Sequence, residues 1–170
     1  MKKILYIFIA ALCFTACENN EHSNSTVKGE YIDLGLPSGT KWNTINETKS
    51  SESNGLYRYA EAIRLFEENI PTNAQWLELK DECTWTWKDS VGYEIVGPNG
   101  KSIILHAEGM DMGKGYLGAG ERGGYWSSDK GETPLGWRFM YLQINSSGYI
   151  YFDYDDYQYI GCSVRLIENP

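Results

Sequence analysis

The stretch Ile70–Trp87 constrains the fold more than any other, because it carries its own helix start signal. Thr72 is an N-cap residue by type, and Gln75 follows it three positions later. This spacing makes a capping box, in which the threonine side chain accepts from the backbone N–H of Gln75 and the glutamine side chain reaches back. The sequence therefore predicts a helix over residues 73–82.

The apolar residues of this stretch recur first with a helical period and then with a strand period. Trp76, Leu79 and Cys83 are spaced i, i+3 and i+7, so they line one face of the short helix. Trp85 and Trp87 alternate directly after it, as on a strand with one buried face. We therefore predict that this helix and strand form a central part of the core.

Apolar periods and turn residues place the remaining elements. An amphipathic pattern predicts another helix over residues 56–69, and alternating apolar runs around Gly97-Pro-Asn-Gly100 predict a β-hairpin. Strands are expected at residues 31–34, 41–42, 91–96, 101–106, 125–128, 137–144, 149–154 and 159–167. The glycine-rich segment Gly109–Gly124 and the polar segment Asp129–Gly136 are expected to be surface loops.

Length and charge limit the functions that the chain can have. It has 170 residues, enough for one domain with a hydrophobic core, and a net charge of −8. An acidic chain is repelled by phosphate backbones and anionic headgroups, which argues against nucleic acid as a partner. Aromatic residues make up 14% of the chain, mostly Tyr and Trp, and these suit half-buried strands and ligand-contacting faces.

The N-terminal segment has the pattern of an exported lipoprotein. Residues 1–16 combine two lysines with an apolar run that is too short to span a bilayer. The run ends in Phe14-Thr-Ala-Cys17, which is typical of lipoprotein processing with Cys17 as the lipidated residue. Residues 17–29 are expected to be a flexible tether and residues 30–170 a single domain. We expect a lipid anchor in the outer membrane, with the side on which the domain is displayed left open.

Six motifs, in order along the chain, resemble one protein family. They are Tyr31–Trp42 (YIDLGLPSGTKW), Pro71–Leu79 (PTNAQWLEL), Cys83–Trp87 (CTWTW), Gly97–Gly100 (GPNG), Gly124–Ser128 (GYWSS) and Gly161–Arg165 (GCSVR). The set resembles the Fibrobacter-type major paralogous domain of Bacteroidota lipoproteins, within the C-type-lectin-like and formylglycine-generating-enzyme superfamily. The resemblance implies an α+β, C-type-lectin-like fold, with two helices packed on a twisted antiparallel sheet and with long loops. It implies little about activity, because function depends on sites and not on folds.

Cys83 and Cys162 are the cysteines that remain after the signal and Cys17. An even cysteine count in an exported chain favours a disulfide, which would join the central helix to the last strand. The alternative is two small buried thiols that do not meet. A copper site like that of formylglycine-generating enzymes is not expected, since neither cysteine has another one near it in the sequence.

The expected function is non-enzymatic binding of a glycan or a surface protein, without a cofactor. In the architecture that the resemblance implies, the helices and the sheet hold loops that contact the ligand. Candidate ligand contacts are Tyr116 and Arg122 in the glycine-rich segment, with Asp129 and Trp137 in and beside the polar one.

Two other functions stay open on the sequence alone. His106 and Glu108 could act as an acid–base pair beside a loop carboxylate, and the chain could be a structural envelope protein without a soluble ligand. No metal site is expected. Zinc needs more His or Cys than the chain offers, and Asp153 and Asp155 could supply only two of the six to eight oxygens that calcium takes.

Overall fold

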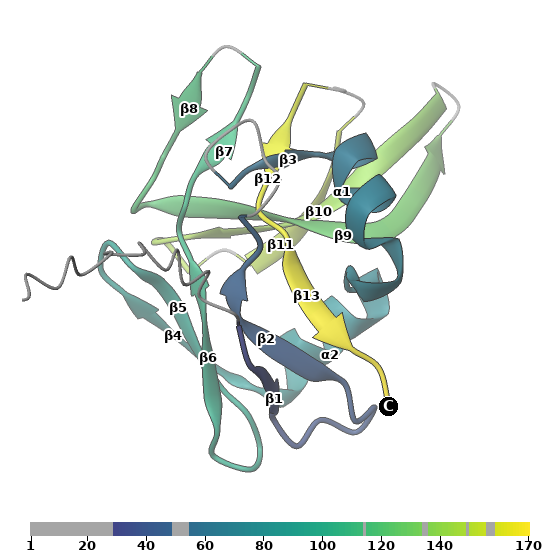
Figure 1. Cartoon of the computed structure of the whole chain (residues 1–170). Coiled ribbons are helices and arrows are strands. Elements are labelled where there is room, and N and C mark those ends of the chain that lie inside the picture. Colours follow the sequence, from purple (N-terminus) through teal and green to yellow (C-terminus); the bar gives the residue numbers. More distant parts are fainter. Residues whose placement is uncertain (1–28, 49–54, 114, 134–135, 149, 156–158) are drawn as a thin grey trace, which may run out of the picture.

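The computed structural model describes residues 29–48, 55–113, 115–133, 136–148, 150–155 and 159–170, with the side chains of 132, 133, 136–140 and 151–155 left out. This part is mixed α+β, with two short helices and mostly antiparallel strands (Figure 1). The elements are β1 (Tyr31–Asp33), β2 (Lys41–Asn46), β3 (Tyr57–Arg58), α1 (Tyr59–Phe66), the 3₁₀-helix η1 (Glu67–Asn69), α2 (Asn73–Glu82), β4 (Thr84–Lys88), β5 (Gly92–Val96), β6 (Ser102–His106), β7 (Met110–Asp111), β8 (Tyr116–Leu117), β9 (Arg122–Thr133), β10 (Gly136–Asn145), β11 (Ile150–Asp155), β12 (Gly161–Cys162) and β13 (Arg165–Glu168).

The predicted central helix is confirmed over its full length, because α2 spans Asn73–Glu82. Its capping box is present: the Gln75 backbone N–H donates to Thr72 Oγ1 at 3.3 Å, and the Thr72 backbone N–H donates to Gln75 Oε1 at 2.9 Å. Trp76 and Leu79 are fully buried on its inner face. The local start signal was therefore sufficient to place this element.

The other predicted helix is shorter than expected. Residues 56–69 were predicted to be helical throughout, but α1 begins at Tyr59 and the last residues form the 3₁₀-helix η1. Tyr57 and Arg58 lie instead in strand β3, which pairs with β12. The backbone hydrogen bonds to a distant strand override the local helical period at this end.

The predicted hairpin is confirmed and extends into a three-stranded sheet in the order β4-β5-β6. The rings of Trp85 and Trp87 lie 5.5 and 5.1 Å from the Tyr93 ring, in edge-to-face contacts. Both tryptophans therefore turn toward the core while Thr84 and Thr86 face solvent, as the alternation predicted.

Both predicted long loops are wrong. Strand β9 runs through the polar residues Asp129–Thr133 and pairs with β10, with an irregularity between Phe139 and Tyr141. The glycine-rich segment contains β7, β8 and the start of β9, and Gly118 and Gly120, at φ +78° and +81°, lie in the connection between β8 and β9. Only glycine adopts such angles readily, so these glycines mark tight turns between strands.

The strands form four small sheets rather than the single twisted sheet that was expected. Among the described residues the strand orders are β1-β2-β13, β11-β10-β9, β3-β12-β7-β8 and β4-β5-β6. The predicted last strand over residues 159–167 is split, so that β12 and β13 belong to different sheets. The α+β class is confirmed at this level, with more strand than helix.

The β9–β10 ribbon separates two clusters of buried side chains. The first core cluster contains Leu34, Leu36, Trp42, Trp76, Leu79, Tyr93, Ile95, Ile103, Leu105, Tyr125, Leu142, Ile144 and Ile167. The second core cluster contains Tyr57, Tyr59, Ala62, Ile70, Met110, Trp126, Tyr141, Ile160, Cys162 and Val164. Neighbouring residues of β9, Tyr125 and Trp126, belong to different clusters, as do their cross-strand partners Leu142 and Tyr141. The ribbon is therefore apolar on both faces.

A buried arginine joins two of the sheets. Arg165 is fully buried in β13, and its Nη1 donates to the Asn43 carbonyl of β2 at 2.6 Å. Its Nη2 donates to the Ile104 carbonyl of β6 at 2.7 Å, and both Nε and Nη2 donate to Asn46 Oδ1. Strands β2 and β6 belong to different sheets, so the hydrogen bonds from the guanidinium connect these two sheets.

We expect Arg165→Met to destabilise the protein by at least about 3 kcal/mol, because three acceptors inside the core lose a charged donor. The measurement is the free energy of unfolding from denaturant titration. Lys41→Ala is the control, since it removes an exposed ion pair between Lys41 of β2 and Glu168 of β13, in which Nζ lies 2.9 Å from Oε2. That change should be worth less than about 1 kcal/mol. Equal losses in the two variants would contradict a special role for Arg165.

Candidate functional site

The structure does not gather the four predicted ligand contacts into one site. Tyr116 lies in β8 and is half exposed, whereas Asp129 lies in β9 beside the start of α2. Figure 1 shows β8 and α2 at opposite ends of the molecule. Arg122 begins β9, and Trp137 lies in β10 with its side chain outside the described part.

Two of these residues have structural contacts that the sequence did not indicate. The Asp129 carboxylate accepts the backbone N–H of Asn73 at 2.6 Å, which satisfies a first-turn donor of α2 and places a negative charge at the positive end of the helix. Arg122 packs on Gly118, where a Cβ would lie only 2.5 Å from its Cγ. Both side chains are thus held against the protein.

A different set of residues lies in one row across the sheet β3-β12-β7-β8. Gly161 of β12 is opposite Arg58 of β3 on one side and opposite Asp111 of β7 on the other. Asp111 is in turn opposite Tyr116 of β8. Directly opposite residues of antiparallel strands point to the same face, so these four residues share one face of the sheet.

The neighbouring row shows which face this is. Tyr57, Cys162 and Met110 are the residues next to Arg58, Gly161 and Asp111 along the three strands, and all three are buried in the second core cluster. The row that contains Tyr116 therefore points away from the core and toward solvent.

An ion pair crosses the middle of this outward row. Arg58 Nη2 donates to Asp111 Oδ2 at 3.0 Å, above Gly161, where a Cβ would lie 3.2 Å from the Asp111 Cβ. Asp111 Oδ1 also accepts the backbone N–H of Gly113 at 2.8 Å, which fixes the carboxylate. The Arg58 side chain is 38% exposed and that of Asp111 is 17% exposed, so water reaches the pair from one side.

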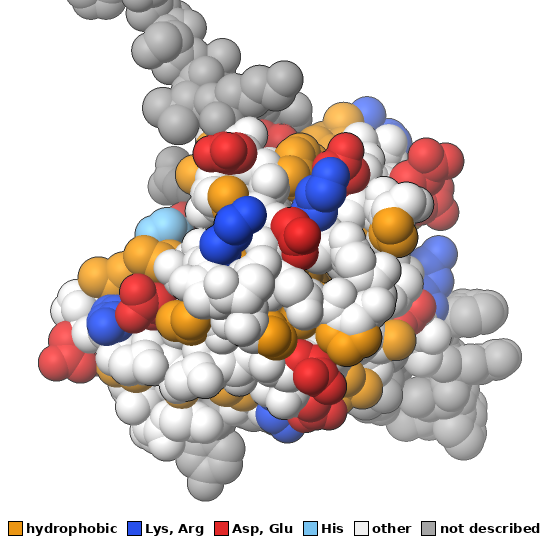
Figure 2. Space-filling model, turned by 90° about the horizontal axis from the view of Figure 1, so that it is seen from below, with side chains coloured by type: hydrophobic (Ala, Val, Ile, Leu, Met, Phe, Trp, Pro, Cys, Tyr) orange, Lys and Arg blue, Asp and Glu red, His pale blue; other side chains and the backbone are white. Residues whose placement is uncertain are grey.

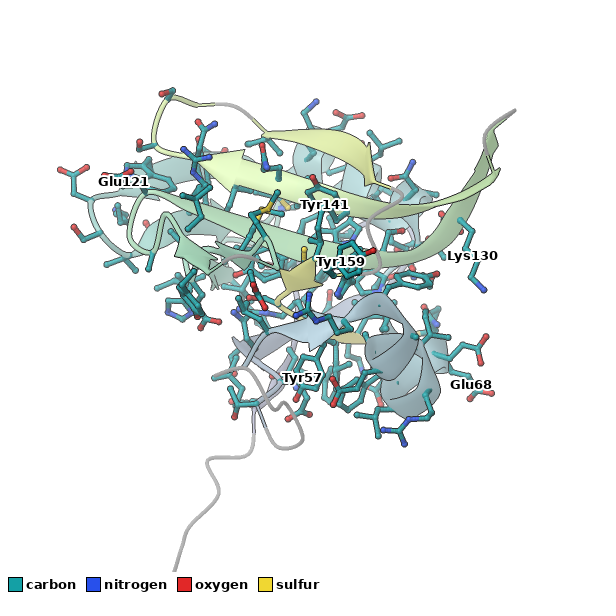
Figure 3. The ribbon with its side chains drawn as sticks, turned by 90° about the horizontal axis from the view of Figure 1, so that it is seen from above. Tyr57, Glu68, Glu121, Lys130, Tyr141 and Tyr159 are labelled. Carbon is teal, nitrogen blue, oxygen red and sulfur yellow. The ribbon has the colours of Figure 1, made fainter. Side chains whose placement is uncertain are left out.

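A tyrosine closes the row on the same face. Tyr159 precedes Gly161 by two residues, is 61% exposed, and lies against Gly113, where a Cβ would be 2.8 Å from its own Cβ. Ile160 between them is buried, as strand alternation requires. We call Arg58, Asp111, Tyr116 and Tyr159, with the glycines 113 and 161 between them, the tyrosine platform. Figure 3 looks down on this end of the molecule, with Tyr159 near the middle of the view.

The β7–β8 hairpin also exposes apolar side chains outside this row. Leu117 is 48% exposed and is opposite Met110, so it points to the other face from Tyr116, and Met112, which follows β7, is 41% exposed. Burial raises the pKa of the Tyr116 phenol, and the carboxylates of Glu108 and Asp111 raise it further. The phenol is therefore neutral at physiological pH and can both donate and accept a hydrogen bond.

His106 and Glu108 do not form the acid–base pair that one hypothesis required. The Glu108 carboxylate accepts from Ser163 Oγ at 3.2 Å, and no hydrogen bond joins it to the imidazole in the described part of the chain. Burial lowers the pKa of His106, the Arg165 charge lowers it further, and Glu108 acts in the opposite direction. The imidazole is therefore neutral at pH 7.

The predicted disulfide is not formed in the structure, which has Cys83 and Cys162 as thiols. Cys162 is fully buried in the second core cluster, close to Met110 and Gly124, whereas Cys83 ends α2 and packs against the first. The β9–β10 ribbon stands between these clusters, which explains why the alternative of two separate thiols applies. Burial raises the pKa of the Cys83 thiol to about 11, with Glu82 and Glu78 adding to the effect.

The remaining surface offers weaker candidates. A hollow of about 280 Å³ lies along Ile63–Asn69, but its lining comes from α1 and η1 alone. The described residues contain no group of three or more His, Cys, Asp or Glu that could hold a metal ion, and the side chains of Asp153 and Asp155 lie outside them. Seen from below, opposite the platform, acidic, basic and apolar side chains are interspersed (Figure 2).

Comparison with known proteins gives no match to a family model, a curated protein or a solved structure. Among the described residues, no helix is long and apolar enough to cross a membrane.

Sequence reasoning found Tyr116 but missed the other members of the platform. Arg58 falls inside the helix predicted over residues 56–69, and Tyr159 and Asp111 lie in segments far from it in the chain. Two small signals were present, because Gly113 and Gly161 stand next to platform residues at positions where a side chain would have filled the surface. Their meaning depends on strand register, which the sequence alone did not provide.

We expect the protein to lose stability on acidification below pH 6.5 through His106. Its folded-state pKa is lowered, so its stabilising contribution is present above the unfolded-state pKa of about 6.5 and is lost as the pH falls through that value and below. His106→Gln should reduce the difference in unfolding free energy between pH 7.5 and pH 5.5. His22→Gln, which changes the other histidine, is the control and should leave this difference unchanged. Identical pH profiles for both variants would refute the assignment.

Proposed function

We propose that this chain is a cell-envelope lipoprotein whose domain binds a glycan or a surface protein through the tyrosine platform, without catalysing a reaction. The observation that carries the proposal is the outward row of Arg58, Asp111 and Tyr116, extended by Tyr159. Strands β3, β7 and β8, with the turn that precedes β12, present these side chains on the face of the sheet turned away from the second core cluster. Exposed tyrosines beside fixed polar groups are typical of recognition surfaces.

The environment of the platform favours binding over chemistry. Its charged groups are paired with each other, since Arg58 donates to Asp111 at 3.0 Å. The tyrosine phenol of Tyr116 is kept neutral by burial and by two carboxylates, so it is not an activated base or nucleophile. These properties suit a site that holds a ligand through hydrogen bonds and ring faces.

We further propose that the domain has the C-type-lectin-like fold and belongs to the Fibrobacter-type family that its motifs resemble. The six ordered motifs support this proposal. The Pro71–Leu79 motif contains the N-cap and the first seven residues of helix α2, and Gly97–Gly100 lies in the turn between β5 and β6. The binding surface would then be a sheet face instead of the loops that the family resemblance led us to expect.

Binding can be tested with the full chain, purified in a detergent without a sugar head group and applied to arrays of immobilised glycans and of surface proteins. We expect a ligand whose binding weakens at least about tenfold in Tyr116→Ala, because an exposed ring that contacts the ligand is lost. Leu77→Ala is the matched control: Leu77 is 39% exposed but lies on α2. Binding that is equal in both variants, or absent from every probe, would count against the platform.

The lipid anchor has a separate test. Cys17→Ala should abolish acylation, because Cys17 is the residue that the processing motif makes available, and the protein should leave the membrane fraction or remain unprocessed. Cys13→Ala is the control, since this cysteine lies inside the apolar run that is expected to be removed. Intact mass and membrane fractionation report the result. A Cys17→Ala protein that fractionates and migrates like the parent would refute the anchor.

A further inference from the structure

We infer that the ligand of the tyrosine platform is a neutral glycan, held without calcium by the Arg58–Asp111 pair and flanking tyrosine rings. This inference rests on the proposed binding function and names the class of ligand. Three properties of the platform carry it: the position of its charges, its unused hydrogen-bonding capacity and its net charge.

The centre of the platform is polar. Asp111 stands between Arg58, on the edge strand β3, and Tyr116 in the strand register, with Tyr159 beside Gly113. Protein interfaces instead have an apolar centre and a polar rim. A protein partner that covered the ion pair with apolar groups would remove water from both charges without replacing its hydrogen bonds, which is unfavourable. Sugar hydroxyls replace those hydrogen bonds directly.

The ion pair has donors and acceptors to spare. A guanidinium has five N–H donors. Within the described residues Arg58 uses one of them on Asp111, and its Nη1 is buried without an acceptor, so the donors that remain for a ligand are on the other nitrogens of this 38% exposed side chain. Each Asp111 oxygen accepts one hydrogen bond, from Gly113 N or from Arg58, and a carboxylate oxygen can accept two. A donor and an acceptor side by side match two adjacent hydroxyls of a sugar ring, each of which can donate and accept.

The ring faces supply the apolar half of the site. Tyr116 and Tyr159 are 49% and 61% exposed, and the glycines 113 and 161 leave the surface between them without side chains. A sugar ring presents C–H groups on its faces and hydroxyls at its edge, so a flat surface with rings at its margins can contact both. Few rotatable groups need to be ordered on the protein side, which favours binding by a small surface.

The charge balance selects a neutral ligand. Arg58 and Asp111 cancel each other, Glu108 lies close enough to raise the pKa of Tyr116, and the whole chain has a net charge of −8. An acidic polysaccharide would meet a negative field with no unpaired arginine at the platform to offset it. Calcium is not required for the contacts described, because Arg58 and Asp111 reach a hydroxyl pair by themselves.

The test is an array of neutral oligosaccharides (gluco-, galacto- and manno-configured) beside uronate-containing oligosaccharides and surface proteins, probed with the full chain with and without EDTA. We expect binding to neutral probes that persists in EDTA and weakens at least about tenfold in Tyr116→Ala and in Asp111→Asn. Leu77→Ala should bind like the parent. Thermal unfolding of each variant separates a lost contact from a lost fold, and Asp111→Asn keeps the acceptor for Gly113 while removing the charge.

The possible results separate this inference from the proposed function. Platform-dependent binding only to uronate probes or only to proteins, or binding that EDTA abolishes, would overturn the neutral, calcium-independent glycan and leave the binding function standing. Binding to neutral glycans that survives both platform substitutions would overturn the site. Folded protein that binds no probe would overturn both proposals.

Discussion

The buried guanidinium of Arg165 is the interaction on which the arrangement of the sheets depends. It donates to the carbonyls of Asn43 and Ile104 and to the side chain of Asn46, so strands β2, β6 and β13 converge on one charged group. A buried charge is tolerated only when its donors are satisfied, and the acceptors come from two segments, β2 and β6, that are distant from Arg165 in the chain. The hydrogen-bond network continues from Asn46, whose side chain donates to the Tyr125 hydroxyl. That hydroxyl donates to the His106 carbonyl at 2.7 Å. Burial raises the pKa of Tyr125 to about 12, so it stays a neutral donor in this network.

This network reaches the candidate site through the backbone between β12 and β13. The Ser163 N–H donates to the Gly124 carbonyl at 2.9 Å, and the Trp126 N–H donates to the Ser163 carbonyl at 3.1 Å, which holds that segment against β9. With Arg165 fixed two residues later, the position of Gly161 two residues earlier is restricted as well. Gly161 is the residue over which Arg58 and Asp111 meet, so the geometry of the platform is set by contacts inside the core. A site held in this way has little ordering entropy to lose when a ligand binds.

How far the sequence predicts the protein depends on how local the determining contacts are. Helix α2 was placed correctly because Thr72 and Gln75 fix its start within one turn. The segment Asp129–Thr133 was assigned to a loop because its composition is polar, yet it is a strand because β10 pairs with it. Arg58 was missed as a site residue for the same reason: the helical period of its neighbours is strong, but pairing of β3 with β12 turns it out of α1 and onto the platform. Strand pairing at long range carries no short sequence signal. The strands in the two predicted loops were therefore missed, and so were the platform residues that depend on strand register.

Glycines contribute to the platform in a way that the sequence analysis did not anticipate. Glycines were read as a sign of a loop that tolerates change, whereas Gly113 and Gly161 lie where any side chain would fill the surface between the platform residues. A Cβ at position 113 would meet Tyr159 at 2.8 Å, and one at position 161 would meet Asp111 at 3.2 Å. The absence of side chains at these two positions therefore shapes the platform as directly as the presence of the tyrosines does. Tyr116 was identified from its residue type and its place in the glycine-rich segment. The other platform residues lie in or next to β3, β7 and β12, and only the register of the sheet shows that they lie beside Tyr116.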